Sequence, residues 1–424
     1  MNYRHIDRSG LRTAAVVGLL LSAMISVARA AEPKVQTVRI PDEGIHPQVQ
    51  TDSRERVHLI YFKGDPKRGD IFYVRSDEAG AQFTPPMRVN SHPDSAVIIG
   101  TVRGPHLAIG KNDRPHVAWM GSDKAEPKGE GKSVPMLYTR LNDAGDSFEP
   151  QRNVVQSKPG LDGGGSVAAD REGNVYVAWH APGAHHARGG HAEQKPGPGH
   201  DEKQPPGKHQ RPAGHGGDEE DRQVWVTRSR DDGKTFDAEM AAIPKKTGSC
   251  ACCGMNMVAA DGGLVFITFR SATDKVNRDI HVLASKDFGK TFEIATVDPW
   301  RVGTCVMSTA AFATRGRTVL GAWETMNQIR VATLSGNGSD EQTLSMPGEA
   351  KSRKHPALAM NDRGEYAVAW AEGTGWNKGG AIVWQVFDPK GQPITDRAGR
   401  LDGLAAWSIP AVVADANGTF RIIY

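Results

Sequence analysis

Two short segments of the chain concentrate residue types that bind soft metals or form disulfides. They contain four cysteines and three methionines: Cys250, Cys252, Cys253, Met255 and Met257 in the first, Cys305 and Met307 in the second. Thiolate and thioether sulfur suit copper, above all Cu(I), and thiolates alone suit zinc. In an exported chain, four cysteines also suit two disulfides, in which Cys305 would pair with one of the other three. Free or redox-active thiols are a third possibility, and all three stay open.

A second group of possible metal ligands lies in an insertion at about 182–221. Its six histidines are His185, His186, His191, His200, His209 and His215, set among Gly, Pro, Lys and acidic residues. A segment with so few apolar side chains cannot bury enough surface to fold, so we expect a disordered tether. Its imidazoles, those of His185, His186 and His191 among them, could hold copper, nickel or zinc loosely as auxiliary ligands. A solvated insertion without function is the simpler interpretation.

The elements that must position these residues repeat along the chain. A hairpin with the approximate form Pro-x-Val-x-x-Asp, turn, Val-x-Val-x-Trp occurs seven times, at 47–61, 105–119, 165–179, 256–269, 309–323, 356–370 and 410–424. Six copies are followed by a second hairpin, so each unit has room for four strands. With the leading strand at 35–40, the strand count favours seven propeller blades over six, the last closed by a strand from the N-terminal end.

Two of the second hairpins contain the turn Ser-x-Asp-x-Gly-x-Thr-Phe, at 229–236 and 285–292, and weaker copies lie at 143–148 and 76–83. The Asp can accept turn N–H groups, the Gly can adopt positive φ, and the Phe can fold under the sheet. This pattern resembles the Asp box, or BNR repeat, of sialidase-like β-propellers. The resemblance implies an all-β propeller of four-stranded blades. It says little about function, because catalytic and non-catalytic propellers share the box.

The N-terminal 30 residues have the features of a secretory signal peptide. Three arginines precede an apolar run at 14–27, which ends in an Ala-x-Ala site at Ala28-Arg29-Ala30. We expect cleavage near Ala30, a periplasmic or secreted product, and one propeller domain over 31–424. No later apolar stretch could span a bilayer. The net charge of +3 is mixed along the chain and does not suggest nucleic-acid binding. We expect a monomer.

Blade topology predicts which residues share a face. The Asp boxes join the third and fourth strands of a blade, whereas both cysteine segments and the histidine-rich insertion lead into or out of strands at the opposite face. The loop-rich face is where a propeller pocket usually opens. His46, His106 and His355 lie at the starts of innermost strands on that face. They are expected either to line the pocket mouth or to form hydrogen bonds with neighbouring loops.

The family resemblance also implies a set of catalytic residues. Sialidases grip a substrate carboxylate with three arginines and use a Tyr activated by a Glu as nucleophile, with an Asp as acid/base. Arg103, Arg270 and Arg301 are weak candidates for the anion grip, and Glu324 and Glu372 for the carboxylates. Arg39-Ile40-Pro41 matches the family's Arg-Ile-Pro motif but precedes the first innermost strand. No Tyr lies in an obvious pocket loop.

These observations predict an exported, non-catalytic propeller that binds a glycan or a protein partner on the face opposite the Asp boxes. A copper or zinc site in the Cys/Met loops is a conditional addition. An exo-α-sialidase-type glycoside hydrolase is the alternative, and a thiol- or metal-dependent enzyme is the third possibility.

Overall fold

The computed structural model describes residues 35–76, 82–156, 161, 163–182, 219–251, 253–274, 276–335, 343–349, 351–415 and 417–424. All of them belong to one compact unit, Pro33–Tyr424. The predicted signal peptide, Cys252, and the insertion histidines His185, His186 and His191 lie outside the described residues. Within them, no helix is both long and apolar enough to cross a membrane.

Strand pairing divides the chain into seven consecutive sheets, the blades of the propeller. Blade 1 contains β2 (Ile45–Thr51), β3 (Val57–Asp65), β4 (Arg68–Arg75) and β5 (Met87–Arg88). Blade 2 contains β6 (His106–Ile109), β7 (Pro115–Met120), β8 (Met136–Arg140) and β9 (Arg152–Asn153). Blade 3 contains β10 (Gly165–Ala169), β11 (Val175–Pro182), β12 (Arg222–Ser229) and β13 (Met240–Ala241). Blade 4 contains β14 (Asn256–Ala260), β15 (Leu264–Arg270), β16 (Ile280–Ser285) and β17 (Glu293–Asp298).

The chain continues through three more blades. Blade 5 contains β18 (Ala310–Arg315), β19 (Thr318–Thr325), β20 (Gln328–Leu334) and β21 (Thr343–Ser345). Blade 6 contains β22 (Arg353–Met360), β23 (Tyr366–Glu372), β24 (Gly380–Phe387) and β25 (Pro393–Leu404). Blade 7 contains β26 (Ala411–Ala414), β27 (Phe420–Ile423) and β1 (Val35–Val38). Four short 3₁₀ turns complete the elements: η1 (Pro41–Glu43), η2 (Lys111–Asp113), η3 (Glu130–Lys132) and η4 (Glu219–Asp221).

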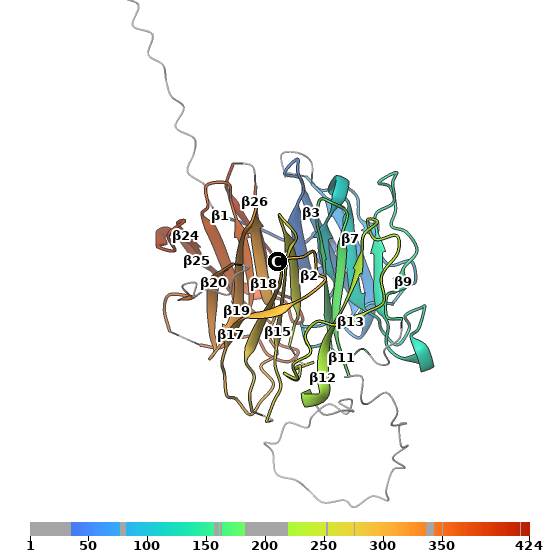
Figure 1. Ribbon diagram of the computed structural model, residues 1–424. Helices are drawn as coiled ribbons and strands as arrows, with labels where there is room; N and C mark the ends of the chain where they lie inside the picture. Colours follow the sequence, from blue (N-terminus) through green and yellow to red (C-terminus); the bar gives the residue numbers. More distant parts are fainter. Residues whose placement is uncertain are drawn as a thin grey trace, which may run out of the picture. The chain divides into compact units, whose positions relative to one another are not determined.

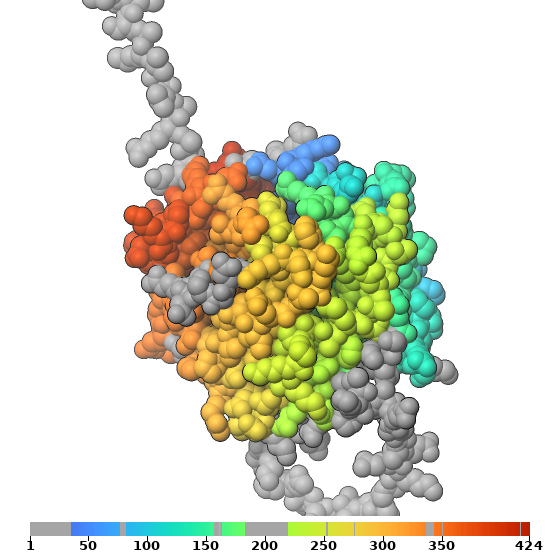
Figure 2. Space-filling view, in the orientation of Figure 1, coloured from blue at the N-terminus to red at the C-terminus, as the bar shows by residue number. Residues whose placement is uncertain are grey.

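The innermost strands close the blades into a ring. Each of β2, β6, β10, β14, β18, β22 and β26 contacts the next, and β26 contacts β2. In Figure 1, blade 6 (β24, β25) lies at the left, blade 4 (β15, β17) near the centre and blade 2 (β7, β9) at the right. On the face shown in Figure 2, the colours run from orange through yellow and lime to teal as adjoining bands. The predictions of a propeller and of seven blades are therefore confirmed.

Blade 7 differs from the other six, in agreement with a strand count that includes only two strands of its own and the N-terminal strand. Six sheets have four strands, whereas the described part of the seventh has three, in the order β26, β27, β1. The N-terminal strand β1 runs parallel to β27, with Val35 opposite Phe420. Closure by a strand from the N-terminal end is as predicted, and in Figure 1 the β1 label lies beside β26.

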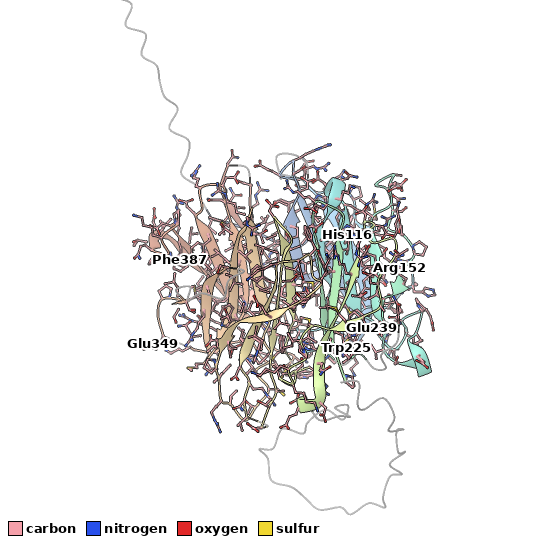
Figure 3. The ribbon with its side chains drawn as sticks, viewed as in Figure 1. His116, Arg152, Trp225, Glu239, Glu349 and Phe387 are labelled. Carbon is pink, nitrogen blue, oxygen red and sulfur yellow. The ribbon has the colours of Figure 1, made fainter. Side chains whose placement is uncertain are left out.

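The apolar side chains that alternate with polar ones along the strands form the core between neighbouring blades. The Trp that ends the sequence repeat lies on the second strand of blades 2, 3, 5 and 6: Trp119, Trp179, Trp323 and Trp370, each at most 2 % exposed. Polar contacts join the blades nearer the rim. Arg152 of β9 lies over the rings of Tyr138 in blade 2 and Phe236 in blade 3, at 5.2 and 5.6 Å from their centroids (Figure 3). Such a cation over an aromatic face is attracted by the ring quadrupole.

The Asp-box turns form as their residue types require. Asp287 Oδ1 accepts hydrogen bonds from the N–H groups of Lys290 and Thr291 at 3.1 and 3.0 Å. Gly289 has φ 71°, a conformation that glycine adopts without strain. Phe292 is 9 % exposed and packs in the core between blades 3 and 4. The structural role predicted for each position is confirmed.

Candidate functional site at the mouth of the central channel

A cavity of about 310 Å³ lies along the propeller axis. Its walls are innermost-strand residues of all seven blades, mostly small or aliphatic, such as Val49, Leu107, Val167 and Ala311. At the face opposite the Asp boxes its lining includes His46, Thr101 and Gly104. Whatever reaches the channel from this face must pass these residues.

The segment 98–104, which we call the axial cap, crosses that end of the channel. The carbonyl O of Thr101 accepts a hydrogen bond from Nε2 of His46 in blade 1 at 3.1 Å. The cap also passes so close to Gly164, which precedes β10 of blade 3, that a side chain would not fit there. A Cβ atom on Gly164 would lie only 2.5 Å from the carbonyl O of Val102. A Cβ on Gly100 would lie 3.6 Å from the methyl group of Met307, which precedes β18 of blade 5. The cap therefore contacts loops from well-separated blades and covers the channel.

Two tryptophans and an arginine gather beside the cap. A Cβ on Gly100 would lie 2.9 Å from Nη1 of Arg103 and 3.4 Å from the ring of Trp376. Trp376 belongs to the loop between β23 and β24 and is 51 % exposed. Its ring meets that of Trp407 edge to face, with centroids 5.0 Å apart. We call Arg103, Met307, Trp376 and Trp407 the mouth surface.

Arg103 is bonded to protein on one side only. Its Nη1 donates to the carbonyl O of Ile99 at 3.1 Å. Within the described part of the chain it has no carboxylate partner. A guanidinium can bind a carboxylate through two parallel N–H···O bonds, and the unpaired side of Arg103 keeps that capacity.

The three predicted histidines lie below the cap rather than on the open surface. His46 and His355 are 2 % and 4 % exposed, and His106 borders the channel. Burial lowers the pKa of His46 to about 4 and the pKa values of His106 and His355 to about 3. Nδ1 of His106 contacts the hydroxyl of Ser166 in blade 3 at 3.3 Å, and Nδ1 of His355 contacts the hydroxyl of Thr309, just before β18 of blade 5, at 3.4 Å. These imidazoles are neutral at pH 7. They form contacts with neighbouring segments, and His46 and His106 also line the channel, so both predicted roles apply.

The cysteine segments divide into a buried and an exposed part. Cys250 and Cys253 are 0 % and 1 % exposed, and their sulfurs lie 3.8 Å apart. A disulfide requires about 2.05 Å, so these two sulfurs are not bonded to each other. Cys305 is exposed. Burial, and then the neighbouring Cys250, raise the pKa of the Cys253 thiol.

The three methionines among the predicted metal ligands have different surroundings. Met257 lines the channel, and Met255 packs in the core between blades 3 and 4. Met307 packs against the buried cluster that contains Cys250 and Cys253. Among the described residues, no group of three or more His, Cys, Asp or Glu side chains is arranged to hold a metal ion.

Glu324 and Arg270, two of the predicted catalytic residues, lie together under the cysteine segment. Glu324 is 1 % exposed, and neither of its carboxylate oxygens has a hydrogen-bond partner among the described residues. Burial raises the pKa of Glu324 to about 7, although the charges of Lys354 and Arg270 favour the ionised form. Arg270 is 2 % exposed and donates to the carbonyl O atoms of Arg278 and Glu324, each at 2.6 Å. Both terminal nitrogens of Arg270 therefore bind backbone carbonyl groups inside the protein rather than facing a ligand.

The remaining candidates have other positions. Glu372 accepts hydrogen bonds from Arg353 at 3.2 Å, Arg400 at 2.8 Å and the indole N–H of Trp370 at 3.0 Å. Arg301 is exposed at the start of the loop that leads to Cys305. Arg103 is the one candidate of the predicted anion grip that the structure places in the mouth surface.

Sequence reasoning missed two features of this site: the pair of tryptophans and the axial cap. Trp376 follows Gly373, Thr374 and Gly375, so it stands in a turn rather than on a strand. An aromatic residue in a glycine-rich loop was the available signal. The path of the cap across the axis depends on contacts between distant blades and has no local pattern.

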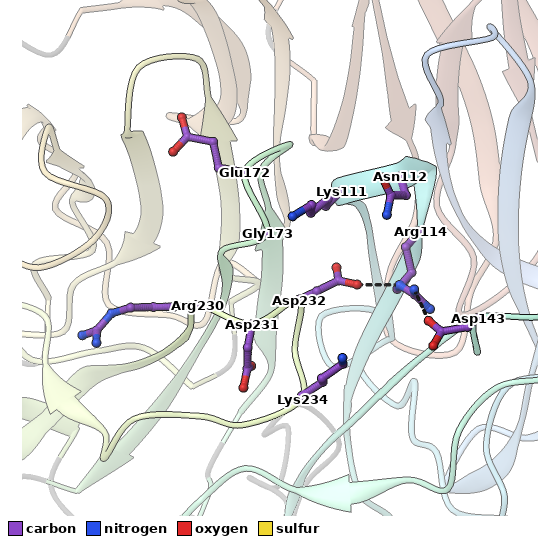
Figure 4. Close-up of a pocket in the computed structure, with 10 residues that line it drawn as sticks. All are labelled: Lys111, Asn112, Arg114, Asp143, Glu172, Gly173, Arg230, Asp231, Asp232 and Lys234. Atoms are coloured by element: carbon purple, nitrogen blue, oxygen red, sulfur yellow. Dashed lines mark hydrogen bonds and ion pairs between the residues drawn. The ribbon is translucent and has the colours of Figure 1, made fainter.

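A second hollow lies on the face of the Asp boxes, between blades 2 and 3 (Figure 4). Arg114 lines one side of it and donates from Nε to Asp232 at 2.7 Å and from Nη2 to Asp143 at 2.5 Å. Arg140 also donates to Asp232, at 3.2 Å. The charges in this hollow bind one another and hold adjacent blades together.

No protein-family model and no curated protein matches the sequence. Solved structures do share the fold. A protein of unknown function from Dyadobacter fermentans has a TM-score of 0.50 at 16% identity, over 84% of this chain and 97% of that one. The Trypanosoma rangeli sialidase in complex with the inhibitor DANA has a TM-score of 0.50 at 10% identity, over 80% of this chain and 54% of that one.

The NanB sialidase from Streptococcus pneumoniae is a further neighbour, with a TM-score of 0.49 at 10% identity, over 86% of this chain and 80% of that one. Identities this low establish fold and not activity. Together with the Asp-box turns and the closed ring of blades, the comparisons establish that this chain has the fold of the sialidase-like β-propellers.

Proposed function

We propose that this protein is a non-catalytic binding protein that engages a glycan on the mouth surface, opposite the Asp boxes. The observation that carries the proposal is the exposure of Trp376, at 51 %, beside Trp407 and Arg103. An exposed tryptophan offers a flat apolar face for the C–H groups of a sugar ring. The Trp407 ring packs edge to face against the Trp376 ring and limits the rotation of the Trp376 side chain.

Arg103 suggests which glycans are preferred. Its guanidinium borders the same glycine as the Trp376 ring, and it has no carboxylate partner within the described residues. A sugar stacked on Trp376 could therefore place an acidic group against Arg103. We propose a ligand that carries a carboxylate.

The alternative, an exo-α-sialidase-type hydrolase, has less support. A general acid must come within hydrogen-bond reach of its substrate. Glu324 has a suitably raised pKa of about 7 but is 1 % exposed. Glu372 is held by two arginines, and Arg270 is directed into the protein. A thiol- or metal-dependent enzyme has no more support, because the two buried sulfurs are enclosed.

We also propose that the propeller acts outside the cytoplasm, as a monomer. The support is the basic and apolar pattern of residues 1–30 with its Ala-x-Ala site.

Binding can be tested by tryptophan fluorescence and calorimetry with oligosaccharides that end in a uronic or sialic acid, each beside its neutral analogue. Trp376→Ala should weaken binding at least about tenfold, or about 1.4 kcal/mol. Arg103→Gln should reduce the preference for the acidic sugar while leaving neutral binding unchanged. Arg301→Gln, an exposed arginine that the structure does not place beside Gly100, is the matched control and should bind like the wild type.

A fluorogenic sialoside separates binding from hydrolysis. We expect no turnover above that of a heat-treated sample. Turnover that disappears in Glu324→Gln would replace the binding protein with the hydrolase. Equal affinity of the wild type and Trp376→Ala for every bound sugar would contradict the mouth surface as the binding site.

A further inference from the structure

Cys250 and Cys253 form a pair of thiols in a tight turn. The N–H of Cys253 donates to the carbonyl O of Cys250 at 3.1 Å, and the N–H of Cys250 donates to the carbonyl O of Arg270 at 2.8 Å. These backbone bonds hold the turn in which the two sulfurs lie 3.8 Å apart. Two thiolates at this distance can both bind one ion placed between them.

The surroundings of the pair are mostly apolar, and the side chains of Arg270 and Glu324 lie nearby. Cys250 and Cys253 share a buried cluster with Ala272 and Val306, and Trp300, Val302 and Met307 pack against that cluster. The guanidinium of Arg270 lies over the Trp300 ring, 5.3 Å from its centroid. An ion of charge +1 held by two thiolates has a net charge of −1, and Arg270 provides the compensating positive charge.

The ligand set selects the kind of metal. Zinc in structural sites takes four N or S ligands, and calcium or magnesium takes six or more oxygens. The described residues contain no group of three His, Cys, Asp or Glu that could hold a metal. Cu(I) prefers soft thiolate and thioether sulfur and forms stable complexes with two thiolates. The pair therefore fits Cu(I) better than any of the other three ions.

Met307 connects this pair with the outside. It packs against the cysteine cluster, and its methyl group also borders Gly100 of the axial cap, beside Trp376. A thioether in this position is a soft ligand on the way from the mouth surface to the buried thiols. A bound ion also needs such an entry path.

We propose that Cys250 and Cys253 bind one Cu(I) ion as two thiolates, and that Met307 passes the ion from the mouth surface to them. Each thiol releases its proton to solvent as its S–Cu bond forms, and copper remains Cu(I) throughout. This site does not depend on glycan binding, and either property can be lost without the other.

The test is an anaerobic competition for Cu(I) between the reduced full-length protein and the coloured chelator bicinchoninate. The wild type should remove one equivalent more than Cys250→Ser/Cys253→Ser. Cys305→Ser, which changes an exposed cysteine, is the control and should match the wild type. All three chains contain the same histidines at 185–215, so weak binding there cancels in the difference. Met307→Leu should keep the equivalent and load it more slowly.

Equal Cu(I) uptake by the wild type and the double variant would overturn the proposal, as would loss of the ion in Cys305→Ser. Circular dichroism and thermal unfolding show whether the double variant folds. If the double variant does not fold, X-ray absorption spectroscopy of the copper-loaded wild type tests the proposal instead. Scattering from two or three sulfurs supports the site, and scattering from nitrogen or oxygen alone contradicts it.

Discussion

The two faces of the propeller use charge differently. In the hollow between blades 2 and 3 on the Asp-box face, Arg114 and Arg140 meet Asp232 at 2.7 and 3.2 Å. At the opposite face, Arg103 has no carboxylate partner within the described residues and lies beside the exposed ring of Trp376. Matched charges hold blades together. An arginine without a carboxylate partner next to an exposed aromatic ring is better suited to recognition.

The largest effect that separates the faces should come from Asp232→Asn. It leaves two largely buried arginines without their shared carboxylate, and we expect a loss of about 3–5 kcal/mol in the free energy of unfolding with glycan binding unchanged. Urea denaturation measures the first and fluorescence titration the second. Asp143→Asn is the control, since the Asp143 side chain is 78% exposed, and it should leave the free energy of unfolding nearly unchanged. A loss of glycan binding in folded Asp232→Asn would show that the faces are not independent.

Glu324→Gln should show a pH-dependent effect at the other face. The folded-state pKa is about 7 against 4.5 for the free group, so between these values the folded protein holds a proton that the unfolded chain has lost. Wild-type stability should therefore gain on the order of 3 kcal/mol from this group as pH falls from 8 to 4. The variant lacks this gain. Unfolding curves at both pH values test it, and a constant difference between the two proteins would show that the carboxyl is not perturbed.

The smallest effect should come from Asp287→Ala in the Asp-box turn. The change removes hydrogen bonds to Lys290, Thr291 and Ser285 at a partly exposed site. We expect a loss of about 1–2 kcal/mol in unfolding free energy and no change in glycan or copper binding. Chemical denaturation measures it, beside Lys286→Ala on the same turn as control. An equal loss in both variants would mean that the turn hydrogen bonds are not what stabilises the box.

The fold could be predicted from the sequence because its signals are local and repeated. The alternating hairpins and the Asp, Gly and Phe of the Asp boxes each specify a turn or a strand within about ten residues. The number of repeats then determines the number of blades in the ring. Closure of the ring by β1 could also be predicted, because the strand pattern at 35–40 has no partner in its own hairpin. The parallel direction of β1 was not predicted, since it depends on how the last blade is completed.

The site could be predicted only in part. Topology correctly placed Cys250, Cys253 and the loop histidines at one end of the channel, because it determines which loops share a face. It could not tell that Cys305 is exposed, or that Glu372 is paired with Arg353 and Arg400. Those outcomes depend on side-chain packing between loops that lie far apart in the sequence. Trp376 was missed for the same reason.

The pairing of β1 with β27 has a consequence for how the molecule assembles. Val35 and Phe420 are among the residues farthest apart along the described chain, yet they are neighbours in one sheet. A chain that has been synthesised only up to a point before Phe420 cannot make this contact, so six blades can stack while the ring stays open. Since bringing such distant segments together is entropically slow, joining the two ends is expected to be the last step of folding.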